Sequence, residues 1–482
     1  MSVHVVAQTG SQMPLAVELA KRICALRFVD LPADVVHWAK VGIVDTVGVT
    51  LAGSGEVDTS VELLERVLPC SIGPSLIFGS TRRTSTLDAA MINGTASHAL
   101  DFDDCNNTFC GHPSAPILPA LFALSDEQET RGEEFLNAYV AGFETECKIA
   151  LGVSLYQYTH GWHPTSTVGV FGAAASCARL LQLDENRTAT ALAIAASFAS
   201  GIKANFGTMT KPLHVGQCAR NGLLAALLAR EGFTANLSAF EHSQGYFEAF
   251  NGSGNYDASK ILPAWGAPFD LARPGLGIKQ YPCCGSTHPA LDAMLELVRT
   301  HDLTSNSVAR IEAWIHKRRL EHTNRPEPRS ALDAKFSLQY CLTRALKDRA
   351  IRMEHFENEA FRDPEIHKIL SRVHVAPYTA SQFPEDNHFA GEVRVTTTSG
   401  DVLVARVDQA LGRTVDSPLP EERLQDKFEA CALRAVSAEA SREVYEAIRT
   451  LEKITDVRQV TALLEAGVRP RQVEAASVES TA

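Results

Sequence analysis

Helical periodicity built from small residues dominates the chain from Met13 to about Phe250. In the clearest stretch, residues 33–52, apolar side chains recur at three- and four-residue steps, and Gly53 follows as a stop signal. Many of these segments are rich in Ala, Gly and Ser, which lets neighbouring helices pack closely. The first half therefore predicts a large all-helical body. Further helices are expected at Glu133 to Val153, Thr165 to Leu181, Arg187 to Ser200 and Val215 to Glu231.

The pattern changes near Pro274. Val308 to His316 alternates between apolar and other residues, as a strand does, and two β-branched runs flank the turn Ser399-Gly400-Asp401, as in a β-hairpin. Helical stretches at Leu291 to Thr300 and Asp333 to Leu346 lie in the same region. These patterns predict a smaller α+β domain.

Helices return after Pro418-Leu419-Pro420, at Glu421 to Val436 and Ser441 to Leu451. The simplest topology brings this C-terminal segment back to the first domain. We therefore predict a mainly α fold, in which a large all-helical domain carries an inserted, smaller α+β domain. The expected segments are 1–272 for the first part of the helical domain, 273–411 for the α+β domain and 412–482 for the C-terminal part of the helical domain.

Composition narrows the classes of function. The 482 residues carry a formal net charge of −12, which argues against a nucleic-acid partner, because phosphate binding needs a basic face. We expect no transmembrane run, and Met1 to Met13 lacks a signal peptide, so a cytoplasmic protein without membrane contact is predicted. The 11 cysteines are scattered without a CxxC motif, which predicts free thiols and neither an iron–sulfur cluster nor structural zinc.

Acidic and imidazole side chains cluster after a small-residue helix that is expected to end near Ala99. Asp101, Asp103 and Asp104 are followed by His112-Pro113. The helix dipole disfavours carboxylates at a helix C-terminus, so three of them at this position need an explanation. Carboxylates beside a histidine are groups that can transfer protons. A solvated helix end is the alternative interpretation. Magnesium–diphosphate binding would need a second acidic motif, which we do not find.

Two further basic motifs have the same character. His163-Pro164 resembles His112-Pro113, and proline as the first helical residue would hold each imidazole at a loop-to-helix junction. Lys211-Pro212-Leu213-His214 precedes an Ala-rich helix, where Lys211 could bind a substrate carboxylate or act as a base. Structural histidines and a surface lysine are the alternatives.

Standard cofactor and metal motifs are not found in the sequence. It contains no GxGxxG motif after a strand, no Walker loop and no GxSxG elbow. His98, Asp101, Asp104 and His112 could in principle bind a metal, but their spacing matches no standard site. We therefore predict chemistry by side chains alone, with neither cofactor nor metal.

Several motifs together resemble the MmgE/PrpD family over about residues 14 to 465. The resemblance implies a large helical domain with a smaller α+β lid, a homodimer, and an active site between the domains. It also implies small polycarboxylate substrates handled without an iron–sulfur cluster. The motifs are His98 to Asp104, Gly111 to Ser114, Gly161 to Pro164, Lys211 to His214 and Tyr281 to His288, with Ala39-Lys40, Asp45-Thr46, Gly48 and Ala52-Gly53 near the N-terminus.

The resemblance also implies roles for single residues. Four residues occupy the positions of the active-site Asp, two His and Lys of the decarboxylase branch, in that order: Asp101, His112, His163 and Lys211. Lys279 matches a lysine of the lid that faces the pocket. The sequence departs from that branch at two positions. The decarboxylases have a tyrosine where this chain has His322, and a histidine where this chain has Cys284. The dehydratase branch lacks the Trp-His-Pro and Lys-Pro-Leu-His motifs of this chain.

These similarities predict removal or return of a proton next to a carboxylate of a small di- or tricarboxylate. His112 and His163 are the expected acid and base, with Asp101 orienting an imidazole, and Lys211 and His322 complete the predicted catalytic set. Predicted substrate-binding residues are Lys279, Cys284 and His214, and Lys211 is expected to hold a carboxylate as well. Asp103 and Asp104 are expected to hold the loop.

The residues alone do not determine whether the same carbanion leads to epimerisation, elimination or decarboxylation. Because the chain departs from both lyase patterns, we expect an epimerase of an amino- or iminodicarboxylate, similar to iminodisuccinate epimerase. The alternative is a lyase, similar either to 2-methylcitrate dehydratase or to cis-aconitate decarboxylase.

Overall fold

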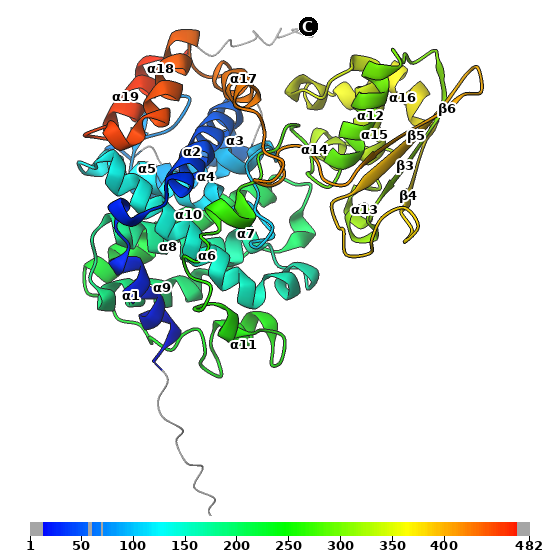
Figure 1. Cartoon of the computed structure of the whole chain (residues 1–482). Helices are drawn as coiled ribbons and strands as arrows, with labels where there is room; N and C mark the ends of the chain where they lie inside the picture. Colours follow the sequence, from blue (N-terminus) through cyan, green and yellow to red (C-terminus); the bar gives the residue numbers. More distant parts are fainter. Residues whose placement is uncertain (1–12, 56–59, 69–70, 470–482) are drawn as a thin grey trace, which may run out of the picture.

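A computed structural model describes residues 13–55, 60–68 and 71–469 of the chain. The part predicted to lack a signal peptide therefore lies outside the described residues, apart from Met13. Figure 1 shows a large helical domain beside a smaller α+β domain. This confirms the predicted fold class.

The helical domain contains the first and the last helices of the chain, which share one hydrophobic core. The C-terminal helices α17 and α18 return to pack against α2, and α19 packs against α18 and α5 (Figure 1). Its helices are α1 (Leu15–Ala25), α2 (Ala33–Ser54), α3 (Ser60–Val67), α4 (Thr86–Ala99), α5 (Ser114–Glu127), α6 (Gly132–Thr159), α7 (Pro164–Thr167), α8 (Gly169–Leu180), α9 (Glu185–Phe198), α10 (Thr210–Arg230), α11 (Tyr246–Asn251), α17 (Glu421–Ala432), α18 (Ala438–Arg449) and α19 (Arg458–Ala466).

Small residues set the helix contacts of this domain. A Cβ atom on Gly94 of α4 would lie 2.9 Å from the Cα of Gly216 in α10, and a Cβ on Gly48 of α2 would lie 3.1 Å from the ring of Phe428 in α17. A side chain at Gly94 would force the two helix backbones apart, and one at Gly48 would require the Phe428 ring to shift. The Ala- and Gly-rich texture therefore has a packing cause.

Several local predictions are corrected. The helix expected from Thr165 to Leu181 is divided into α7 and α8 at Val168. The helical domain also contains a two-stranded antiparallel sheet, β1 (Ser75–Leu76) and β2 (Arg83–Thr84), so it is not purely helical.

Helix α2 is long and apolar enough to cross a membrane, although no such run was expected. Within its most apolar window, 78% of the residues are buried inside the protein, as in a core helix.

The α+β domain has a second core, which runs in sequence from Cys283 to Ala405. Its four-stranded sheet has the order β4-β3-β5-β6, with β3 parallel to β4 and antiparallel to β5, and with β5 antiparallel to β6. Gly400, at φ +97°, forms the predicted hairpin turn between β5 and β6. The elements are α12 (His288–Thr300), β3 (Val308–Ile315), α13 (Lys317–Thr323), α14 (Ala331–Lys335), α15 (Leu338–Asp348), α16 (Pro364–Leu370), β4 (Val373–Pro377), β5 (Gly391–Thr397) and β6 (Val402–Val407).

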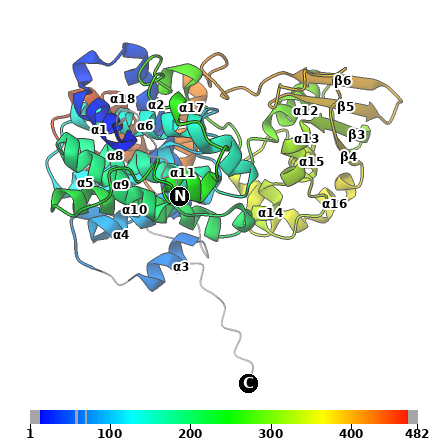
Figure 2. The same ribbon diagram turned by 90° about the horizontal axis from the view of Figure 1, so that it is seen from below.

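The helix predicted from Asp333 to Leu346 is interrupted, because Ser337 caps α15 by accepting a hydrogen bond from the backbone of Tyr340. The preceding helix, α14, therefore stands apart and lies on the side of the α+β domain that faces the helical body (Figures 1 and 2). The exact boundaries 272/273 and 411/412 stay predictions.

Candidate active site

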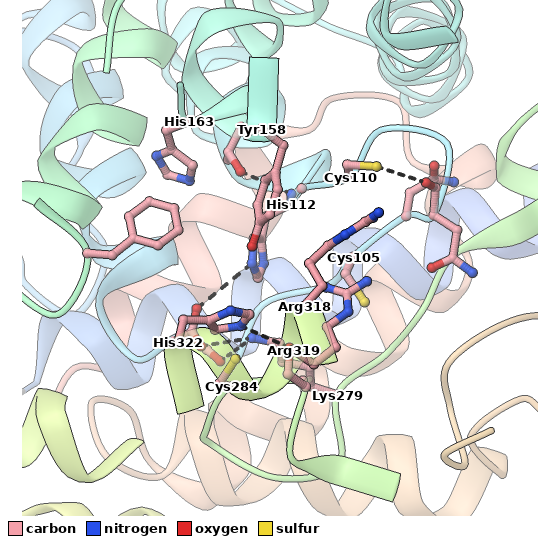
Figure 3. Close-up of a pocket in the computed structure, with 18 of the residues that line it drawn as sticks. Cys105, Cys110, His112, Tyr158, His163, Lys279, Cys284, Arg318, Arg319 and His322 are labelled. Carbon is pink, nitrogen blue, oxygen red and sulfur yellow. Dashed lines mark hydrogen bonds and ion pairs between the residues drawn. The ribbon is translucent and has the colours of Figure 1, made fainter. Parts of the chain in front are cut away.

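A cavity of about 120 Å³ lies between the two domains. In Figure 3, His112, Tyr158 and His163 come from the helical domain, and His322, Cys284 and Arg319 come from the α+β domain. Of the predicted site residues, Asp101, His112, His163, Lys211, Lys279, Cys284 and His322 line this cavity. His214 does not line it but contacts His163, which does, with 3.3 Å between their Nδ1 atoms.

Asp101 lies at the centre of a buried ion-pair group. It follows α4 with φ +53°, a left-handed conformation that side chains such as Asp tolerate. Its carboxylate oxygens lie 2.6 Å from Nζ of Lys211 and 3.2 Å from Nζ of Lys279. Burial would raise the pKa of Asp101, but the two lysines outweigh it and hold this pKa well below its usual range. Asp101 is therefore an ionised anchor for two cations.

Three lysines hold the loop that carries Asp101. Backbone carbonyls of residues 100–102 accept, in order, hydrogen bonds from Lys335 (3.0 Å), Lys279 (2.6 Å) and Lys427 (2.8 Å). Lys335 belongs to α14 of the α+β domain and Lys427 to α17 of the helical domain. The unusual backbone of the loop is thus stabilised from both domains.

Asp103, rather than Asp101, is placed to orient an imidazole. Its Oδ2 lies 2.7 Å from Nδ1 of His98 and 3.1 Å from Nδ1 of His112, whereas Asp101 lies 3.8 Å from Nε2 of His112. A carboxylate at Nδ1 keeps a proton there and leaves Nε2 free for substrate. This corrects the expected roles of Asp101 and Asp103. Asp104 does hold the loop, since it accepts hydrogen bonds from the backbone and the hydroxyl of Ser114.

His163 is the N-cap residue of α7, with Pro164 as the first helical residue, as predicted. Burial lowers the pKa of His163 well below its usual range, and the neighbouring His98 and Lys211 lower it further. The imidazole is therefore neutral at pH 7. For His112-Pro113, the prediction that the proline is the first helical residue is off by one, since α5 begins at Ser114.

Three arginines of the pocket were not predicted. Arg318 and Arg319 begin α13, and Arg413 lies after β6. Within the described residues, no carboxylate pairs with any of the three. The ring of Phe389 stacks against both Arg319 (4.7 Å) and Arg413 (4.2 Å).

Two atoms of these arginines mark a place for a ligand. The Nε atoms of Arg319 and Arg413 are buried and have no hydrogen-bond partner in the part of the chain that the structure describes. Arg413 also donates to Oδ1 of Asn107 at 2.7 Å, which holds its guanidinium at the cavity. A buried donor without a partner destabilises the protein, and a carboxylate bound here would offset this by accepting its hydrogen bond.

Tyr158 was missed for a different reason. The predicted helix ends at Val153, but α6 continues to Thr159 and brings this side chain to the cavity. Lys203 lies 3.6 Å from its ring centroid. Burial raises the pKa of Tyr158 to about 12, so the phenol keeps its proton.

His98, Asp103 and His112 are the described residues that lie close enough to hold a metal ion, with ligand atoms within 4.8 Å of one another. Asp103 already contacts both imidazoles, which accounts for the cluster without a metal. Metal-free chemistry stays a prediction.

Family models match both parts of this architecture. The MmgE/PrpD N-terminal domain matches residues 17–259, and the MmgE/PrpD C-terminal domain matches residues 281–453. The chain belongs to the MmgE/PrpD family. Its two-domain plan, mainly α with a smaller α+β domain, is that of the family.

Relatives within the MmgE/PrpD family extend along nearly the whole chain. A human cis-aconitate decarboxylase is 30% identical over 94% of this chain and 95% of its own length. The mouse cis-aconitate decarboxylase is 28% identical over 92% of each chain. That of Aspergillus terreus is 25% identical over 96% of this chain and 98% of its own.

Proposed function

We propose that this protein is a lyase that decarboxylates a small unsaturated tricarboxylate of the cis-aconitate class. The observation that carries the proposal is the charge of the cavity: five cationic side chains and a single carboxylate, Asp101, line it. A local cationic pocket of this kind attracts polyanions even though the whole chain has a net charge of −12.

Substrate carboxylates are assigned to the arginines. Lys211 and Lys279 already share Asp101, whereas Arg318, Arg319 and Arg413 have no acidic partner among the described residues. Each guanidinium offers a planar fork that matches a carboxylate. The small volume of the cavity, about 120 Å³, also favours a compact substrate.

Decarboxylation requires that the negative charge developing on carbon be stabilised and that this carbon then receive one proton. When CO₂ leaves a carbon next to a C=C bond, the C–C bond breaks and its electron pair enters the neighbouring π system. Lys211 and Lys279 with Asp101 form a fixed group of net positive charge that can stabilise this carbanion. His112, oriented by Asp103, is the proposed donor of the proton that carbon takes up.

The relatives support the lyase alternative over the epimerase that the sequence departures favoured. The human, mouse and Aspergillus terreus proteins are all named cis-aconitate decarboxylases. Epimerisation has no such support.

The test is incubation with cis-aconitate in D₂O, followed by proton NMR and by CO₂ release. We expect release of CO₂ and a product with one deuterium on carbon. A new double bond from 2-methylcitrate without CO₂ would instead identify a dehydratase. Deuterium exchange in an amino- or iminodicarboxylate, with no fragment lost, would identify an epimerase.

Chelation tests the metal-free chemistry. Turnover of cis-aconitate is expected to persist after dialysis against EDTA, because the proposed charge stabilisation comes from lysines. Loss of turnover that a divalent metal restores would contradict this and would point to His98, Asp103 and His112 as ligands.

A further inference from the structure

The loop before α12 presents one of two adjacent cysteines to the active-site cavity. Cys283 is packed into the core of the α+β domain, whereas Cys284 lines the cavity. The N–H of Cys284 donates to the carbonyl of Lys335 at 2.9 Å, so the position of this residue is fixed by the backbone. Its thiol is thus held at the surface of the cavity.

His322 of α13 is the partner of this thiol. Its imidazole forms a hydrogen bond with the side chain of Cys284, and its Nε2 lies 3.1 Å from the hydroxyl of Ser286. Figure 3 shows His322 and Cys284 together on one side of the cavity. A thiol bonded to an imidazole is the arrangement that produces a nucleophilic thiolate in proteins.

Cations surround this pair. Lys279 and Arg319 are near enough for the charge of Cys284 to act on both of them. The Nε of Arg319 is buried and lacks a hydrogen-bond partner within residues 13–55, 60–68 and 71–469, so a carboxylate can bind beside the thiol. Cys110 lines the same cavity but differs, because its thiol donates to the carbonyl of Asn107 at 3.4 Å and has no imidazole partner among the described residues.

We propose that Cys284 and His322 form a nucleophilic thiolate–imidazolium pair that reacts covalently with carboxylate-bearing electrophiles, in particular α,β-unsaturated polycarboxylates. The choice of unsaturated ligands rests on the proposed function. The thiol proton passes to His322, sulfur forms a bond to the β-carbon, and the C=C π bond breaks. The resulting electron pair on the α-carbon then takes the proton from His322. The adduct fills the pocket and stops turnover.

The local electrostatics agree with this geometry. Burial would raise the pKa of Cys284, but the hydrogen bond and the charge of His322 outweigh burial and lower this pKa to about 7. Cys24, outside the cavity, provides a contrast, because burial raises the pKa of its thiol. Both cysteines are free, so the two can be compared within one molecule.

The test is alkylation of the native full-length protein with iodoacetate and with iodoacetamide, read by peptide mass spectrometry between pH 5 and 9. We expect the rate at Cys284 to rise with a midpoint near pH 7, while Cys24 reacts only at higher pH. The iodoacetate-to-iodoacetamide rate ratio at Cys284 should exceed that of glutathione by on the order of tenfold, because the cationic pocket attracts the anion.

Two variants separate the causes. His322→Gln should move the midpoint at Cys284 upward toward pH ~8.5, the ordinary thiol value. Arg319→Met should raise the midpoint much less than His322→Gln does, because His322 is the main cause of the lowered pKa of Cys284, and it should lower the ratio of the two rates toward that of glutathione. A midpoint at Cys284 that matches Cys24, or a rate ratio equal to that of glutathione in the wild-type protein, would overturn the proposal.

Adduct formation by an unsaturated dicarboxylate, such as the decarboxylation product, is measured separately by intact mass and by time-dependent loss of turnover. Both should occur in the wild type and be absent in Cys284→Ser. A protein that turns over cis-aconitate but shows no reactive Cys284 would refute this inference and leave the proposed function standing. Rapid labelling by iodoacetate without turnover of cis-aconitate would refute the function instead.

Discussion

The two walls of the active-site cavity differ in how their charges are satisfied. On the helical-domain wall, Lys211 is paired with Asp101 and His112 with Asp103. On the α+β wall, Arg318 and Arg319 of α13 have no acidic partner in the described chain, and Arg413, which follows β6 and stacks on Phe389 of that domain, has none either. The difference teaches that the charges of the first wall are balanced without substrate, whereas the arginines of the second wall lack a counter-charge until carboxylates bind.

This division suits a carbon–carbon lyase. Groups that are already paired and fixed do not reorganise when charge develops in the transition state. Cations without a partner, in contrast, contribute mainly to substrate binding. The helical wall is therefore assigned to chemistry and the α+β wall to binding, with Lys279 bridging them through Asp101.

The largest expected effect comes from Lys211→Met on the helical wall. Its loss removes one cation from beside the carbanion, so kcat should fall by about 10³-fold, with a much smaller change in KM. Steady-state kinetics with cis-aconitate measure this, and Lys21→Met on α1 is the matched control. A raised KM with an unchanged kcat would assign Lys211 to binding and break the comparison.

Asp103→Asn should have the next largest effect. Without the carboxylate at Nδ1, His112 loses its preferred tautomer, and kcat should fall by about 10²-fold. Asp104→Asn is a sharp control, because burial raises the pKa of Asp104 well above its usual range and the neutral amide resembles the protonated acid. Equal losses in the two variants would mean that Asp103 only holds the loop.

On the α+β wall, Arg319→Met should act on binding. Loss of one charge-assisted contact is expected to raise KM by about 20-fold while kcat changes little. Arg329→Met, at an exposed position near α14, provides the control. A fall in kcat equal to that of Lys211→Met would show that the walls are not divided as described.

The smallest effect is on stability and involves His98. Burial lowers the pKa of His98 to about 4, below the 6.5 of the unfolded chain, so the unfolded state binds more protons between these values. Stability from this group is therefore present above pH 6.5 and is lost as the pH falls toward 4. His98→Gln should reduce that slope by about 1 kcal/mol per pH unit in denaturant titrations. An unchanged slope would show that His98 is protonated in the fold. His367→Gln, at an exposed site on α16, is the control.

Sequence patterns predicted the helical wall better than the α+β wall. Asp101, His112, His163 and Lys211 belong to short motifs with proline or clustered acids, which mark helix ends in the sequence itself. Arg318 and Arg319 follow Lys317, and such a run of cations is typical of a solvated face. Only the tertiary fold, which places α13 on β4 and opposite residues of the helical domain, brings these side chains to the cavity.

Other errors have local physical causes. His214 was predicted from its motif, but its place in α10 puts it against His163 and not at the cavity itself. The roles of Asp101 and Asp103 could not be separated by spacing, because the left-handed backbone at Asp101 turns the two carboxylates toward different partners. Three lysines from distant segments hold that backbone.

A crystal structure with the saturated analogue propane-1,2,3-tricarboxylate tests the central claim most directly. We predict carboxylates bound to Arg319 and Arg413, with the carbon chain facing His112 and with the pairing of Lys211 and Asp101 intact. Carboxylates that displace Asp101 from Lys211, with the arginines left unliganded, would contradict the division of the pocket into a binding wall and a chemical wall.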